Sequence, residues 1–184
     1  MKRTAALIAS IMLVLSCFSG CGGKERSASE SSLPEVMKKL KAPDITIEIP
    51  GSYETTSTDS NKTVYVKDDA SIIVNSDKLP ENCDGLDSYV DYALKTYTEY
   101  SDNIEILKNE PVDANGNIGN VLEYVYTINS ENGAFSKYCM VGFFTGDEQI
   151  YLITCKADPD NADKYRDEFT SVVQSFDLKE DAEK

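Results

Sequence analysis

Histidine and tryptophan are absent from the 184 residues of this chain. The lack of histidine removes the commonest general base, the Ser/His and Cys/His catalytic pairs, and His-ligated zinc or haem. Basic residues are few, with 18 Lys and Arg against 32 Asp and Glu, and the net charge of −14 argues against a nucleic-acid-binding protein. What is present is an ordinary apolar content of 41%, in a length that fits one domain with short appendages.

The first twenty residues have the pattern of a secretory signal peptide. Lys2 and Arg3 precede an apolar run, Ala5–Leu15, and the small-residue stretch Ser16–Gly20 follows it. The apolar run is too short for a transmembrane helix, which needs about 20 apolar residues. The sequence therefore predicts export, with residues 1–20 as the signal.

The residues around Cys21, Phe18-Ser-Gly-Cys-Gly-Gly-Lys24, resemble the lipobox of bacterial lipoproteins. That resemblance implies cleavage before Cys21, a diacylglycerol on its thiol, and an acyl chain such as palmitate on the new N-terminus. Val14–Cys17 is a competing box that would place the lipid on Cys17, and an ordinary signal peptide with an incidental cysteine is a further alternative. Cleavage before Cys21 removes Lys2 and Arg3, so the mature charge is 16 − 32 = −16. We therefore expect a domain on the extracytoplasmic face of the cell membrane, held by lipid alone because anionic headgroups repel it.

Residues 21–43 are predicted to be the lipidated cysteine and a flexible tether. Small polar residues fill 22–32, and Leu33, Val36, Met37 and Leu40 recur at the spacing of a short amphipathic helix. A partly ordered linker is the alternative for this last part. The folded domain is predicted over residues 44–178, and residues 179–184 form a charged tail.

Alternating and helical periodicities predict an α+β domain. Ile45–Ile49 alternates strictly, and residues 86–101 and the segment from Asp158 to Phe176 carry apolar residues at helical spacing. Further strands are predicted over residues 53–56, 62–67, 71–75, 103–108, 120–128, 137–144 and 149–155. The expected architecture is an antiparallel sheet of six to eight strands with at least two helices packed on it.

The Ile-Pro-Gly end of the first strand, the middle helix, Tyr151-Leu-Ile-Thr154 and the closing segment Phe169 to Phe176 resemble the PsbP-like domain. The resemblance covers about residues 44–178 and implies an α/β/α sandwich, found in photosystem accessory proteins and in many bacterial lipoproteins. It carries no chemistry, and a metal site that uses histidine cannot be transferred to a chain without one. We predict no cofactor other than the covalent lipid, and no metal site.

Three cysteines, Cys83, Cys139 and Cys155, would remain after processing and acylation. Cys139 and Cys155 lie on consecutive predicted strands. If the numbers of paired residues add up to 294, these cysteines lie opposite each other and can form a disulfide. A register of 293 would exclude that bridge. Buried free thiols that pack as small apolar side chains are the alternative.

No catalytic template is complete in this sequence. Tyrosine is frequent, and Tyr92, Tyr124 and Tyr126 are a candidate partner surface, although a tyrosine-rich edge of the core explains them as well. The leading hypothesis is a non-catalytic, lipid-anchored accessory domain that binds a protein or envelope component. The alternatives are an extracytoplasmic enzyme that uses a buried carboxylate or Tyr, and a ligand- or metal-binding accessory subunit of a transporter.

Overall fold

The computed structural model describes residues 37–41, 45–59, 61–131, 133–146 and 149–179, all within the unit Glu35–Lys184. The predicted signal, Cys21, the alternative Cys17 and most of the predicted tether and tail lie outside the described residues. In the described ranges no helix is long and apolar enough to span a membrane.

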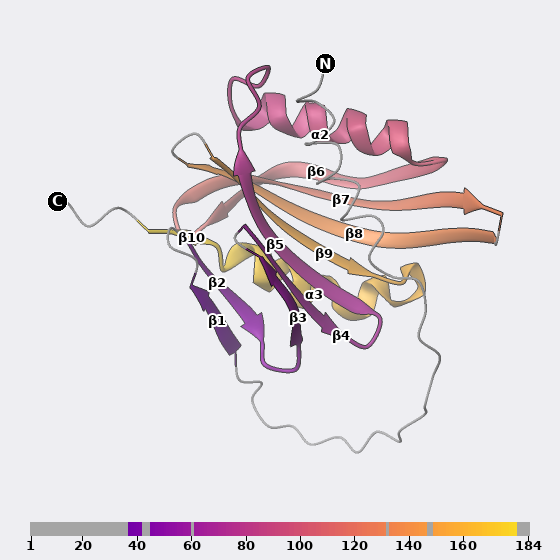
Figure 1. Cartoon of the computed structure of the whole chain (residues 1–184), viewed down its shortest axis with the longest axis horizontal. Helices are drawn as coiled ribbons and strands as arrows, with labels where there is room; N and C mark the ends of the chain where they lie inside the picture. Colours follow the sequence, from indigo (N-terminus) through magenta and orange to yellow (C-terminus); the bar gives the residue numbers. More distant parts are fainter. Residues whose placement is uncertain (1–36, 42–44, 60, 132, 147–148, 180–184) are drawn as a thin grey trace. The chain divides into compact units, whose positions relative to one another are not determined.

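A seven-stranded antiparallel sheet forms the centre of the fold, which confirms the predicted six to eight strands (Figure 1). Its order is β3-β4-β5-β9-β8-β7-β6, so β3 and β6 are the open edges. The strands are β3 (Glu54–Asp59), β4 (Lys62–Lys67), β5 (Ala70–Lys78), β6 (Asn103–Ala114), β7 (Asn117–Ser130), β8 (Gly133–Gly146) and β9 (Gln149–Ala157).

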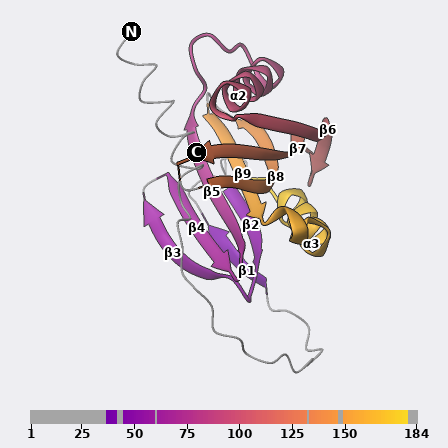
Figure 2. The same ribbon diagram turned by 90° about the vertical axis from the view of Figure 1, so that its right-hand side faces the viewer.

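Two helices cover opposite faces of the long strands (Figure 2). Helix α2 (Leu86–Tyr100) packs through Tyr89 on Phe143, with the ring centroids 6.1 Å apart. Helix α3 (Ala162–Gln174) packs through Phe169 on Tyr138. Phe143 points to the α2 face of β8, and the side chains at 138, 140 and 144 point to the α3 face, as strand alternation requires. The apolar side chains of β8 are therefore buried on both faces, as expected for the α/β/α sandwich that the resemblance implies.

A small second sheet, in the order β1-β2-β10, completes the core on the α3 side. Its strands are β1 (Met37–Lys41), β2 (Ile45–Pro50) and β10 (Asp177–Leu178). The alternation predicted for β2 is confirmed, because Ile45, Ile47 and Ile49 are all at most 2% exposed. The helix predicted over Leu33–Leu40 is wrong for residues 37–40, which pair with β2 in an antiparallel ladder. Pairing with the edge of β2 overrides the helical spacing of so short a segment.

One tight turn and the side chain of Asp69 fix where α3 begins. The β4–β5 hairpin turns at Asp68, with φ 50°, and brings Asp69 to the start of α3. One carboxylate oxygen of Asp69 accepts hydrogen bonds from Asp158 N and Asn161 Nδ2, each 3.1 Å away, and the other accepts one from the Tyr165 hydroxyl. Burial favours a higher pKa for Asp69, but these hydrogen bonds outweigh it and lower the pKa below its ordinary value. Asp69 thus holds α3 to the sheet as a carboxylate.

Candidate functional site

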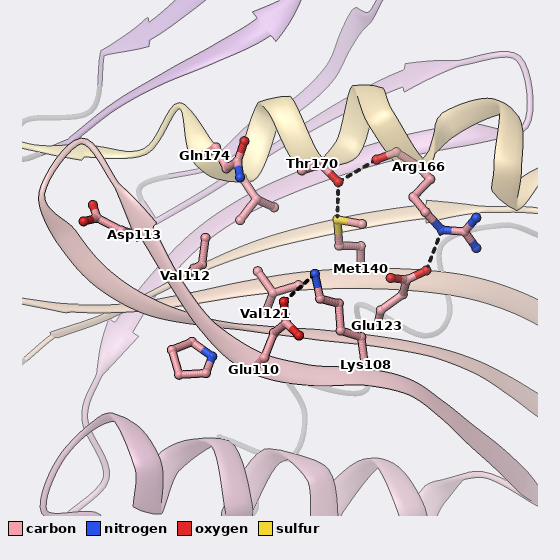
Figure 3. A pocket seen from close by; sticks show the side chains of 12 residues that line it. Lys108, Glu110, Val112, Asp113, Val121, Glu123, Met140, Arg166, Thr170 and Gln174 are labelled. Atoms are coloured by element: carbon pink, nitrogen blue, oxygen red, sulfur yellow. Dashed lines mark hydrogen bonds and ion pairs between the residues drawn. The ribbon is translucent and has the colours of Figure 1, made fainter.

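A groove of about 270 Å³ lies between α3 and strands β6, β7 and β8 (Figure 3). The apolar part of its lining comes from Val112, Val121, Met140 and Val173, and the polar part comes mainly from Lys108, Glu110, Asp113, Glu123, Arg166, Thr170 and Gln174. The groove therefore has an apolar floor, and charged side chains also line it.

The strand register places the β6 and β7 side chains of this groove on one face. In the β6–β7 ladder, Lys108 lies opposite Glu123 and Glu110 lies opposite Val121. Alternate residues of both strands therefore point toward α3. A glycine lets the helix come close: a Cβ at position 142 would lie 2.7 Å from Cγ1 of Val173. The type I′ turn at Asn115–Gly116, with φ 53° and 86°, closes the β6–β7 hairpin at the end of the groove.

The buried carboxylate of Glu123 anchors one end of the groove. Glu123 is 6% exposed, and its Oε1 accepts hydrogen bonds from Arg166 Nε at 2.8 Å and from the Tyr138 hydroxyl at 2.9 Å. The Arg166 guanidinium also pairs with Asp163 and lies over the ring of Tyr138. Burial and the bond to Glu123 raise the pKa of Tyr138, and the bonds to Glu123 and Asp163 raise the pKa of Arg166. At this end of the groove, the Tyr138 hydroxyl and the Arg166 guanidinium are therefore both protonated, and both donate to the Glu123 carboxylate.

Two further contacts complete the polar lining. Lys108 Nζ pairs with Glu110 Oε1 at 2.7 Å, on the β6 side. Thr170 Oγ1 bonds to the backbone oxygen of Arg166 at 2.8 Å and lies 3.8 Å from Met140 Sδ. A more open polar hollow of about 540 Å³ adjoins the groove through Gln174, which lines both. Since the ionised groups hold one another in pairs above an apolar floor, the arrangement is suited to binding a side chain or a small molecule.

The predicted disulfide between Cys139 and Cys155 is wrong. The β8–β9 register sums to 295, so Cys139 lies opposite Lys156 and Cys155 opposite Met140. The two cysteines therefore point to opposite faces of the sheet, and they are free buried thiols, as is Cys83. Burial raises the pKa of Cys139 to about 11, so its thiol is protonated at neutral pH.

The candidate partner surface at Tyr92, Tyr124 and Tyr126 is also wrong in its main part. Tyr124 and Tyr126 are 3% and 1% exposed, on the strand face that α2 packs against, and Tyr124 stacks on Tyr97 with centroids 5.3 Å apart. Tyr92 is half-buried beside Tyr89. The alternative, a tyrosine-rich edge of the core, is what the structure shows.

Two acidic stretches serve local structure in the described residues. Asp113 Oδ1 accepts the backbone N–H of Gly116 at 2.8 Å within the β6–β7 turn, and Asp158 pairs with Lys137 at the start of the last helical segment. No group of three or more acidic, cysteine or histidine side chains in the described ranges could hold a metal ion.

Sequence reasoning missed Glu123, Arg166 and Asp113 as members of one groove. A usable signal existed for Glu123, which is the only charged residue in the run from Val121 to Tyr126. A charge in such a buried run needs a partner. The partner itself, 43 residues further along the chain, has no local signal.

The comparisons with known proteins agree on the fold. No protein-family profile matches the sequence, and no curated protein matches it. Among solved structures, the cyanobacterial PsbP (CyanoP) of Synechocystis sp. PCC 6803 is similar at a TM-score of 0.60 and 13% identity, over 83% of this chain and 98% of that one. A variant of the protein Mog1 has a TM-score of 0.58 and 13% identity, over 82% and 98%.

LpqN of Mycobacterium tuberculosis, described as involved in cell envelope biogenesis, has a TM-score of 0.51 and 10% identity, over 80% of this chain and 93% of its own. At these identities the likeness establishes the fold alone. The fold is PsbP/Mog1-like, which confirms the architecture that the sequence resemblance implied.

Proposed function

We propose that this chain is a lipid-anchored, extracytoplasmic accessory domain without catalytic activity, which binds a protein or another envelope component in the groove between α3 and β6. The observation that carries the proposal is the groove itself, because Lys108 pairs with Glu110 and Arg166 with Glu123 above an apolar floor. LpqN, which has a similar fold, is described as involved in cell envelope biogenesis, and this supports a role at the cell envelope.

Catalysis by a buried carboxylate is the less favoured reading of the same site. Glu123 is such a carboxylate, but Arg166 and Tyr138 both donate to its Oε1, and both remain protonated. A general base must also be within reach of the substrate, and Glu123 is only 6% exposed. The paired carboxylate therefore fits a binding groove better than a catalytic one.

The anchor rests on the lipobox-like sequence at Cys21. The segment from residue 22 to β1 would span at most about 50 Å if fully extended, which would keep the start of β1 within that distance of the bilayer. We expect Cys21→Ala to abolish labelling by an alkyne-palmitate analogue and to release the protein from the membrane fraction. The matched Cys17→Ala variant should keep both the label and the membrane location. A Cys21→Ala protein that is still labelled would contradict the anchor.

Binding in the groove can be tested by site-specific photo-crosslinking in cells. A photoreactive residue at Gln174, exposed at the groove, should give a discrete adduct with an envelope component. The same residue at Lys95, exposed on α2 across the sheet, should not give that adduct. Adducts from both positions, or from neither, would contradict a binding role for the groove.

A further inference from the structure

Helix α3 is tied to the rest of the domain by polar side chains as well as by apolar packing. Three of its residues bond to side chains outside the helix: Tyr165 to Asp69, Arg166 to Glu123, and Glu168 to Tyr53. A second oxygen of Glu168 pairs with Lys67 of β4 at 3.2 Å. Helix α3 therefore cannot leave the sheet without breaking several hydrogen bonds and ion pairs.

Helix α2 is held differently. In the described part of the chain, the hydrogen bonds and the ion pair of its side chains all stay within residues 84–99. Its contacts with the sheet are aromatic and apolar, with Tyr89 on Phe143 and Tyr97 stacked on Tyr124. Packing alone thus holds α2 to the sheet.

The sheet face under α2 also contains polar atoms that the packing leaves unpaired. Asn120 lies directly opposite Phe143 in the β7–β8 ladder, Tyr126 lies beside Tyr124, and Ser101 follows the helix. Among the described residues, Asn120 Oδ1, the Tyr126 hydroxyl and Ser101 Oγ are buried without a hydrogen-bond partner. Buried polar groups are nearly always paired, and an unpaired one loses free energy that contact with water would restore. Hydration of these atoms would therefore favour a state in which α2 has moved away.

The two ends of α2 differ in how firmly they are held. Asp102, just after the helix, donates its backbone N–H to the Thr127 oxygen at 2.9 Å and accepts the backbone N–H of Asn129 with its carboxylate. At the other end, residues 79–85 connect β5 to the helix, and no side chain caps the first turn at Gly85. The fixed point for a movement of α2 is therefore its C-terminal end.

We propose that α2 opens from the sheet as one unit, pivoting at Asp102, while α3 and the groove beside it stay folded. Because the two helices lie on opposite faces of the sheet, opening of α2 leaves the α3 contacts in place (Figure 2). The open state exposes the rings of Tyr124 and Phe143, which α2 covers in the closed state. Sub-global openings of this kind involve the elements with the fewest stabilising contacts. This inference does not depend on the proposed function of the groove.

Two cysteines on adjacent strands report on the two faces of the sheet separately. Cys139 lies opposite Tyr124, on the face that α2 covers, and Cys155 lies in the core on the α3 side. Both thiols are 0% exposed, and burial raises the pKa of each above its ordinary value. Neither thiol should therefore react with a thiol reagent while the domain is closed.

The test adds excess N-ethylmaleimide to the full-length protein without denaturant and follows the labelling of each cysteine by peptide mass spectrometry. Each rate is divided by the rate of the same cysteine in the urea-denatured protein. We expect Cys139 to be labelled about tenfold faster than Cys155 or more, because opening of α2 exposes Cys139 alone. If Cys139 stays protected as long as Cys155, or longer, only global unfolding exposes it and the proposal is wrong.

Tyr89→Ala tests whether α2 moves as a unit. Tyr89 packs on Phe143, which lies about 13 Å along β8 from Cys139, so its removal makes no direct opening over that thiol. We expect the variant to label at Cys139 about tenfold faster or more, since a buried ring that holds α2 closed is lost. Asp91→Ala, at an exposed position of the same helix, should change that rate less than about twofold. An unchanged rate in Tyr89→Ala would mean that only the segment beside Tyr97 fluctuates, and it would overturn the movement of α2 as a unit.

Discussion

Replacing Phe169 by alanine is expected to lower the free energy of unfolding by about 4 kcal/mol, because a fully buried aromatic ring is removed and a cavity is left. The ring stacks between Tyr138 of β8, with centroids 6.3 Å apart, and Tyr165 one turn earlier on α3, at 5.6 Å. Neither neighbour can fill the space, since both hydroxyls are engaged, with Glu123 and Asp69. Urea unfolding followed by tyrosine fluorescence measures the loss, and no tryptophan obscures that signal.

Asp167→Ala is the matched control for this prediction. Asp167 is exposed on the same helix, and its replacement should change the free energy of unfolding by less than about 0.5 kcal/mol. A loss below about 1 kcal/mol for Phe169→Ala would mean that α3 does not pack on β8 as described.

Arg166→Met is expected to cost about 2–3 kcal/mol of stability, because it leaves the Glu123 carboxylate buried with only the Tyr138 hydroxyl as partner. Removing one member of a buried ion pair typically costs about 3–5 kcal/mol. The lower figure applies here because the Arg166 side chain is 40% exposed and water screens part of the pair. Methionine keeps the apolar stem that packs beside Tyr138, so the change isolates the charge.

A double-mutant cycle separates the buried charge from lost packing. In the Arg166→Met background, Glu123→Gln should recover at least half of the lost stability, since it removes the unpaired charge and leaves an amide oxygen for Tyr138. When Arg166 is intact, Glu123→Gln should not raise the free energy of unfolding. If the double variant is no more stable than Arg166→Met alone, the cost comes from packing and the ion pair contributes little.

The sheet and both helices could be predicted from the sequence because their signals are local. Strands β8 and β9 are apolar almost throughout, and the buried face of α3 from Tyr165 to Val173 has helical spacing. The Asn115–Gly116 turn fixes the β6–β7 hairpin, because these two residues accept positive φ at low cost. Each of these features depends on residues that are close together in the chain.

The disulfide and the groove depend on information that is not local. A shift of one residue in the β8–β9 register, from 294 to 295, moves Cys139 to the face opposite Cys155, and no pattern in either apolar strand distinguishes the two registers. The groove requires Arg166 on α3 to reach Glu123 on β7, which only the packing of the helix on the sheet determines. Strand β1 was missed because its pairing partner, and not its own periodicity, sets its conformation.

The open edges of the main sheet bear on how this domain behaves at high local concentration. Edge strand β6 carries a bulge between Ile106 and Lys108, and Pro111, which lies opposite Asn120, has no backbone N–H to donate. The other edge, β3, has six residues, all polar, and a bulge of its own. Both edges are therefore poor templates for the strand of another molecule. If the proposed lipid anchor crowds copies together, they would then collide without merging their sheets, and they would remain separate domains.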